Sequence, residues 1–236
     1  MMKRRTMLAG LTAAVALGLS GCSVEFTSKP IGSGTSAGST SSSTTKAAEE
    51  TGFAFAKGDV VTSDFVEPVL AAQKKLKSFT VHMATETPDG SMVVTSEYEK
   101  VDGVEHSHSV IRTGETLVEQ IFIGDQGYDK QEDGTWKKVN GVTVGAGADD
   151  SLEQFAKNVK SVKYVGDDGH GHKFELQVDV SKAMQKEGAV MGADMWLDDE
   201  MRMVRSEYVF DNGNGQASSV ITRDGFDEEY NIKAPI

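Results

Sequence analysis

The stretch from Phe79 to Arg112, FTVHMATETPDGSMVVTSEYEKVDGVEHSHSVIR, decides the fold class. Its first run alternates in character, so that Phe79, Val81 and Met83 point one way and the residues between them point the other. Turn residues separate the runs, with Pro88-Asp89-Gly90-Ser91 after the first strand and Asp102-Gly103 after the second. The stretch therefore predicts three antiparallel strands joined by hairpins.

The same period-two pattern continues through the rest of the chain, interrupted by helices. One helix is expected from about Ser63 to Lys77, and Pro68 is expected in its first turn or at its start. A second helix, with Leu152, Phe155 and Val159 on its apolar stripe, begins at the capping residue Ser151, and a short third one covers 181–188. Further strands are expected over 117–123, 128–130, 136–139, 162–165, 173–180, 194–198, 201–211, 217–223 and 226–232. This order of elements predicts an α+β fold, a curved antiparallel sheet with its helices on one face.

Composition limits the classes of partner. The 236 residues carry a net charge of −12, from 24 Lys and Arg against 36 Asp and Glu. An acidic chain of this kind is not expected to bind nucleic acid, because phosphate contacts need clustered Lys and Arg. The single cysteine excludes an intrachain disulfide and a multi-cysteine zinc site.

Residues 1–21 have the form of a signal peptide. Lys3, Arg4 and Arg5 precede an apolar run, 7–19, that is too short to span a bilayer. The run leads into Leu19-Ser20-Gly21-Cys22, which resembles the lipobox of bacterial lipoproteins. In that family the thiol receives a diacylglyceryl group and the chain is cut just before the cysteine. The resemblance implies that Cys22 is acylated with palmitate-type chains and anchors the protein to the extracytoplasmic face of the cell membrane.

Two segments follow the signal. Removing the signal takes away three basic and no acidic residues, which changes the net charge from −12 to −15. Residues 22–58 form the lipidated N-terminus and a Ser/Thr/Gly-rich segment, with a composition typical of a flexible tether. Gly34-Thr35-Ser36-Ala37-Gly38 matches G-x-S-x-G, but no strand precedes it, so it is not interpreted as a nucleophile elbow. Residues 59–236 form the folded domain.

Several local patterns of the folded domain resemble the LppX/LprG/LprA-type lipoproteins of actinobacteria, within the LolA-like superfamily. These patterns are Leu76-Lys77-Ser78-Phe79, the hairpin 121–129, the tryptophan strand Gly134-Thr135-Trp136-Lys137-Lys138, the segment 195–205 and the ending Ile232-Lys233-Ala234-Pro235. The resemblance implies a half-barrel with helices on its concave face and an apolar cavity that binds or transfers lipid or lipoglycan. It implies no catalytic residue, and the protein is expected not to be an enzyme and to need no cofactor and no metal.

The candidates for the lining of the cavity are apolar residues of both helices and of inward-facing strand positions. They are Phe65, Val69, Leu76, Val81, Met83, Phe122, Leu152 and Phe155. Each of them also suits an ordinary core. The alternative function is therefore an envelope interaction module with a filled core and a protein partner. A continuous apolar cavity favours lipid binding, and a filled sheet with an exposed apolar patch favours the interaction module.

Two other groups of residues deserve testing as metal ligands. His106 and His108 face the same side of an expected strand, and His170-Gly171-His172 follows Asp167-Asp168 in a turn. If the two pairs met, they would offer a site for Zn²⁺ or Cu²⁺. The acidic runs Asp198-Asp199-Glu200 and Asp149-Asp150 offer weak Ca²⁺ ligands. The preferred interpretation is that all these residues are ordinary strand and turn residues.

Overall fold

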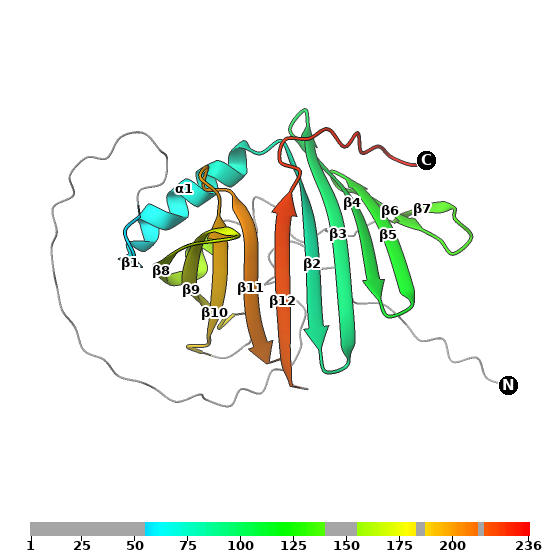
Figure 1. Cartoon of the computed structure of the whole chain (residues 1–236). Coiled ribbons are helices and arrows are strands. Elements are labelled where there is room, and N and C mark those ends of the chain that lie inside the picture. The colour runs from blue at the N-terminus through cyan, green and yellow to red at the C-terminus, as the bar shows by residue number, and fades with distance from the viewer. Residues whose placement is uncertain (1–54, 140–154, 183–186, 212–214) are drawn as a thin grey trace.

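A computed structural model describes residues 55–139, 155–182, 187–211 and 215–236. Its main feature is one twelve-stranded sheet in which every pair of neighbouring strands is antiparallel. The sheet is bent and does not close, because β1 and β7 lie at opposite ends of it (Figure 1). The predicted curved antiparallel sheet is confirmed, and the described part of the chain is mostly β.

The elements follow the chain in a simple order. Strand β1 (Gly58–Val60) precedes helix α1 (Thr62–Lys75). The meander that follows consists of β2 (Ser78–Thr87), β3 (Gly90–Val101), β4 (Val104–Thr113), β5 (Thr116–Ile123), β6 (Gln126–Lys130) and β7 (Trp136–Val139). The second meander consists of β8 (Val159–Asp168), β9 (Gly171–Asp179), β10 (Val190–Leu197), β11 (Met203–Asp211) and β12 (Gln216–Asp224).

The two meanders meet side by side in the middle of the sheet. The spatial order is β1-β8-β9-β10-β11-β12-β2-β3-β4-β5-β6-β7. The join is the pairing of β12 with β2, in which Ile221 lies opposite Met83. Strands β2, β3 and β4 confirm the three antiparallel strands predicted for the stretch from Phe79 to Arg112. Asp102 and Gly103 both have positive φ, as a two-residue turn between twisted strands requires.

Helix α1 packs on the half of the sheet that contains β8–β11. Its buried residues Phe65, Val69 and Gln73 recur every fourth position, so they form one stripe along the helix. Phe65 and Val69 belong to a core cluster with Phe174 of β9 and Leu197 of β10. The place of the helices on a concave face stays a prediction.

Pro68 differs from its expected place. It lies inside α1, after the first turn, since the helix begins at Thr62 and its N-cap is Val61. Pro68 is exposed, while Phe65 and Val69 on either side of it are buried. We attribute the tolerance of the missing N–H to this packing, which holds both turns against the sheet.

One predicted helix ends earlier than expected, and one predicted strand is absent. Val159, expected on the second helix, is the first residue of β8, and only 155–158 are helical among the described residues of that segment. Residues 226–232 form no strand. Asp227 and Asn231 have positive φ there, which interrupts an extended chain. Residues 151–154 and most of the short helix expected over 181–188 lie outside the described residues.

The C-terminal residues cross the ends of β2 and β3 instead of extending the sheet. Glu99 of β3 accepts hydrogen bonds from the backbone N–H groups of Asn231 (3.1 Å) and Ile232 (2.6 Å). The carbonyl of Ile232 lies 3.1 Å from Nδ1 of His106. These contacts hold the tail at the upper edge of the sheet in Figure 1, where the C-terminus is marked.

Candidate functional site

The register of the strands places a continuous row of side chains on one face of the sheet, here called the inner face. Residues directly opposite each other in neighbouring strands point to the same face. The row runs through Tyr164, Phe174, Met195, Ser206, Ile221, Met83, Val94, Ile111 and Val118. All but Ser206 are apolar or aromatic. Along this row the inner face therefore carries apolar or aromatic side chains on eight of nine adjacent strands.

The buried members of this face form two clusters. The first is the cluster under α1 described above, and it includes the predicted residues Phe65, Val69 and Phe155. The second consists of Val81, Met83, Val94 and Ile221, which are 1–3 % exposed, and it contains no residue of α1. Five of the eight predicted lining residues thus fall into two groups on the two halves of the sheet.

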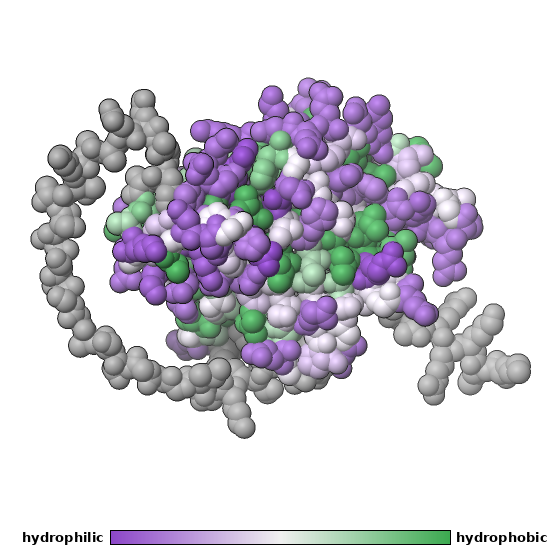
Figure 2. Space-filling view, in the orientation of Figure 1, coloured by the Kyte–Doolittle hydropathy of each residue, from purple (hydrophilic) through white to green (hydrophobic). Residues whose placement is uncertain are grey.

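The remaining predicted residues lie outside both clusters. Leu76 follows the end of α1 and Phe122 lies on β5, and both are buried. Leu152 and Cys22 lie outside the described residues. A single lipid-binding cavity lined by all the candidates stays a prediction. In Figure 2, hydrophobic residues gather to the right of α1, with hydrophilic residues above them.

A polar row borders the second cluster on the inner face. It runs from Arg223 through Val81 to Ser96, Ser109 and Gln120, each opposite the next. Its polar members are buried, with Arg223 and its neighbours at most 9 % exposed. The Ser96 and Ser109 hydroxyls are 2.8 Å apart, and Gln120 donates to Asp129 over 2.8 Å. Most of this row therefore satisfies its own hydrogen bonds.

Arg223 is the exception. Its Nη1 donates to Oε1 of Gln73 over 2.7 Å, and its guanidinium lies 5.0 Å from the centre of the Phe79 ring. The Phe79 ring stacks on Tyr98. Burial lowers the pKa of Arg223 to about 10 and raises the pKa of Tyr98 to about 12. At neutral pH the buried arginine is therefore charged and the tyrosine is neutral.

Arg223 is not among the site residues predicted from the sequence, although the alternating pattern of its strand indicates that it points inward. Ala217, Ser219 and Ile221 are the inward positions of β12, and Arg223 continues their period of two. A charged residue at an inward position of a strand is unusual, because a buried charge is costly without a partner. An arginine in this register would have been the strongest polar candidate.

The histidine pairs do not meet. His106 and His108 lie on β4, and His172 lies on β9, with five strands between these two in the sheet. His108 lies between Glu97 (3.3 Å) and Glu119 (3.1 Å). Across the described ranges, no group of three or more His, Cys, Asp or Glu residues could hold a metal ion.

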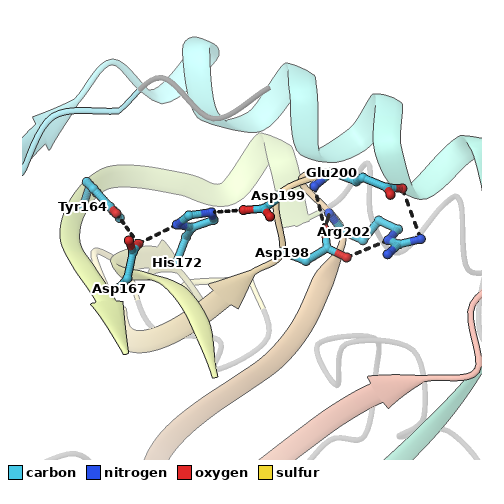
Figure 3. Close-up of polar contacts among 7 residues, drawn as sticks. All are labelled: Tyr164, Asp167, His172, Asp198, Asp199, Glu200 and Arg202. Atoms are coloured by element: carbon cyan, nitrogen blue, oxygen red, sulfur yellow. Dashed lines mark hydrogen bonds and ion pairs between the residues drawn. The ribbon is translucent and has the colours of Figure 1, made fainter. Parts of the chain in front are cut away.

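His172 instead takes part in a chain of polar contacts near the start of β9 (Figure 3). Its Nδ1 lies 2.5 Å from Asp167 and its Nε2 lies 2.8 Å from Asp199. The Tyr164 hydroxyl donates to Asp167, and the hydrogen bonds from Tyr164 and His172 lower the pKa of that carboxyl. These contacts tie the turn before β9 to the turn after β10.

The acidic run at the end of β10 forms a turn. Asp198 accepts hydrogen bonds from the backbone N–H groups of Glu200 (3.0 Å) and Arg202 (2.9 Å). Its other oxygen lies 2.7 Å from Nε of Arg202. Asp198 thus has the bonding of a turn residue rather than of a calcium ligand. Asp149 and Asp150 lie outside the described residues.

Comparison with solved structures finds similar chains in other proteins. The crystal structure of LprF from Mycobacterium bovis matches with a TM-score of 0.58 and 14 % identity, over 74 % of this chain and 96 % of that one. The MucA/MucB complex of Pseudomonas aeruginosa matches with a TM-score of 0.46 and 12 % identity, over 73 % and 60 %. MucB in complex with MucA(peri) gives 0.38 and 16 %, over 70 % and 54 %.

The likeness to LprF confirms the predicted resemblance at the level of the fold. No family model matches the sequence, and no curated protein matches it either. Within the described part of the chain, no helix combines the length and the apolar character needed to cross a bilayer.

Proposed function

We propose that this protein is a membrane-anchored lipoprotein, outside the cytoplasm, that binds or transfers lipid without performing chemistry. The observation that carries the proposal is the apolar row of the inner face, which continues beyond the half of the sheet covered by α1. The second cluster (Val81, Met83, Val94 and Ile221) lies on this part of the inner face, and its apolar side chains, an adaptable methionine among them, suit contact with an acyl chain. The fold shared with LprF supports the same function through the resemblance described above.

The low exposure of the second cluster also favours the alternative. Side chains that are 1–3 % exposed are typical of a filled core. With a filled core, the protein would act as an envelope interaction module that binds a protein partner. The two functions differ in one property, which is whether an acyl chain enters the space over Val81 and Met83.

Native mass spectrometry of the full-length protein, released from detergent micelles, tests the proposal. We expect additional masses of non-covalently bound lipid on the wild type. Val81→Trp should remove them and leave the stability nearly unchanged, because an acyl-chain space accommodates the ring. Val93→Trp is the matched control, because Val93 is 46 % exposed on the neighbouring strand and should keep the lipid.

The opposite result would favour the interaction module. A wild type without bound lipid, together with a loss of about 1–3 kcal/mol in Val81→Trp, would show that the inner face is already packed.

The anchor has its own test. Cys22 is the only cysteine, so Cys22→Ala should leave the precursor uncleaved at this position and unlabelled by palmitate analogues in cells. Continued labelling of the variant would show that acylation occurs elsewhere.

A further inference from the structure

Three buried side-chain atoms of the described residues have no hydrogen-bond partner, and all three lie on or against the inner face. They are Nε2 of Gln73, Nε of Arg223 and Oγ of Ser206. Oε1 of Gln73, on α1, already accepts a hydrogen bond from Nη1 of Arg223. Two of the three unpaired atoms therefore belong to one hydrogen-bonded pair of residues. Ser206 of β11 lies opposite Ile221, two positions before Arg223 on β12. Buried polar atoms normally have partners, so this group indicates a missing one.

The charge of the group indicates what kind of partner is missing. Arg223 is 9 % exposed, and among the described residues no carboxylate forms an ion pair with it. A buried guanidinium without an anion is costly, and the Phe79 ring offsets only part of that cost. The free Nε of Arg223 and Nε2 of Gln73 are both N–H donors. They suit an oxyanion, which accepts hydrogen bonds and supplies the missing negative charge.

The surroundings of the pair indicate what the anion is attached to. Arg223 lies opposite Val81, and the next inward residues along the same two strands are Ile221 and Met83, both in the second apolar cluster. An anionic group at Arg223 would thus lie at the border of the apolar surface proposed to hold an acyl chain. A small free anion would leave that surface unused.

We infer that Arg223 and Gln73 form the binding site for the anionic group, a carboxylate or a phosphate, of an acyl ligand whose chain lies on the second cluster. The inference rests on the lipid-binding function proposed above. It narrows the ligand from lipids in general to lipids with an oxyanion next to the acyl chains.

Photo-crosslinking of the full-length protein in mild detergent tests the inference with matched probes. A photoactivatable fatty acid is compared with its methyl ester, and a photoactivatable phosphatidic acid with the corresponding diacylglycerol. We expect the wild type to prefer one of the anionic probes over its neutral partner by at least about tenfold, as for other buried charge pairs. Inorganic phosphate at millimolar concentration is added as a competitor to separate a lipid headgroup from a free anion.

Two variants test whether the preference for anionic over neutral probes depends on Arg223 and Gln73. Arg223→Met removes the charge and should abolish the preference while the neutral probes still label. Gln73→Glu places a carboxylate of the same shape beside Arg223, so it should fold well and lose the anionic preference through internal pairing. Gln131→Glu is the matched control, because it makes the same change in charge at an exposed position and should behave like the wild type.

The outcomes separate the two proposals. Equal labelling of the wild type by anionic and neutral probes would overturn the inference and leave lipid binding intact. Labelling by none of the probes would overturn both. An anionic preference that persists in Gln73→Glu would place the anion elsewhere. Displacement of both anionic probes by inorganic phosphate would show that the site takes a free oxyanion and that the acyl part of the inference is wrong.

Discussion

A side chain at position 171 would collide with the backbone of the neighbouring strand. Gly171 has a φ of 125°, and a Cβ built there would lie 2.5 Å from the carbonyl oxygen of Leu197. It stands between His170 and His172 at the start of β9, where β9 pairs closely with β10. The glycine thus allows the turn that carries the His172 contacts to approach β10.

We therefore expect Gly171→Ala to destabilise the protein by about 2–4 kcal/mol, since the methyl group meets backbone and the conformation is strained. A chain of this size should lose at least ~5 °C in Tm, measured by circular dichroism. Gly169→Ala is the control in the same turn, because a Cβ there meets nothing within 4 Å. Similar Tm values for the two variants would contradict the prediction.

Among the described carboxyl groups, Asp179 has the most strongly lowered pKa. It accepts a hydrogen bond from the backbone N–H of Ser181 (2.9 Å), and Nζ of Lys160 lies 3.0 Å from it. The bonds from Ser181 and then the one from Lys160 lower the pKa of Asp179 to about 2. The folded state therefore binds this proton less readily than the unfolded state does. The stabilisation is present above about pH 4 and is lost as the pH falls towards 2.

Asp179→Asn should consequently be less stable than the wild type at pH 6, and the difference should shrink between pH 4 and pH 2. Urea denaturation at pH 6, 4, 3 and 2.5 measures both effects. Asp59→Asn, on the exposed side of β1, serves as the control for the change in charge. A difference between wild type and Asp179→Asn that is constant over this range would refute the shift.

The residues of the candidate site differ in how far the sequence predicts them. Phe65, Val81 and Met83 follow from periodicity, because burial of an alternating strand or a helical stripe is a local property. Arg223 and Gln73 are 150 positions apart in sequence, and they meet only through the packing of α1 on the sheet. No local pattern contains that contact.

At the scale of elements, strands with turn glycines and alternating residues are predicted well, and segments without them are not. The hairpins β2–β5 have both signals, and the sequence alone suggests their bounds to within a few residues. Strand β1 has three residues and no alternation to detect. The C-terminal segment has alternating residues, but side-chain contacts to Glu99 and positive φ at Asp227 and Asn231 prevent a strand.

Glu99 of β3 holds the C-terminal segment 226–236 through two hydrogen bonds. Glu99→Ala removes the carboxylate that accepts from Asn231 and Ile232, so the amides of 226–236 should exchange with solvent markedly faster. A typical hydrogen bond contributes about 0.5–1.5 kcal/mol to stability, so losing these two should cost about 1–3 kcal/mol. Glu86→Ala, an exposed carboxylate on β2, should change neither quantity. Unchanged exchange in Glu99→Ala would show that the tail is held by other contacts.

At the scale of the whole molecule, one sheet joins parts of the chain that are far apart. The pairing of β12 with β2 unites the two meanders, and the pairing of β1 with β8 fixes the start of the domain at the far edge. Phe55 lies in edge contact with Phe174, with 5.5 Å between the ring centres. Val60 packs against the first core cluster. The chain is therefore tied to the sheet from Phe55 onward.

This attachment predicts that two neighbouring deletions in the full chain change the Tm by different amounts. Deleting 31–50, which the Ser/Thr/Gly-rich composition assigns to the tether, should leave Tm within about 1 °C of the wild type. Deleting 51–60 removes Phe55 and β1, and the lost apolar burial should cost ~2 kcal/mol, or about 4–8 °C in Tm. Thermal unfolding followed by circular dichroism measures both. A fall of several degrees in the first deletion would show that the tether packs on the domain, and equal Tm values would show that β1 adds no stability.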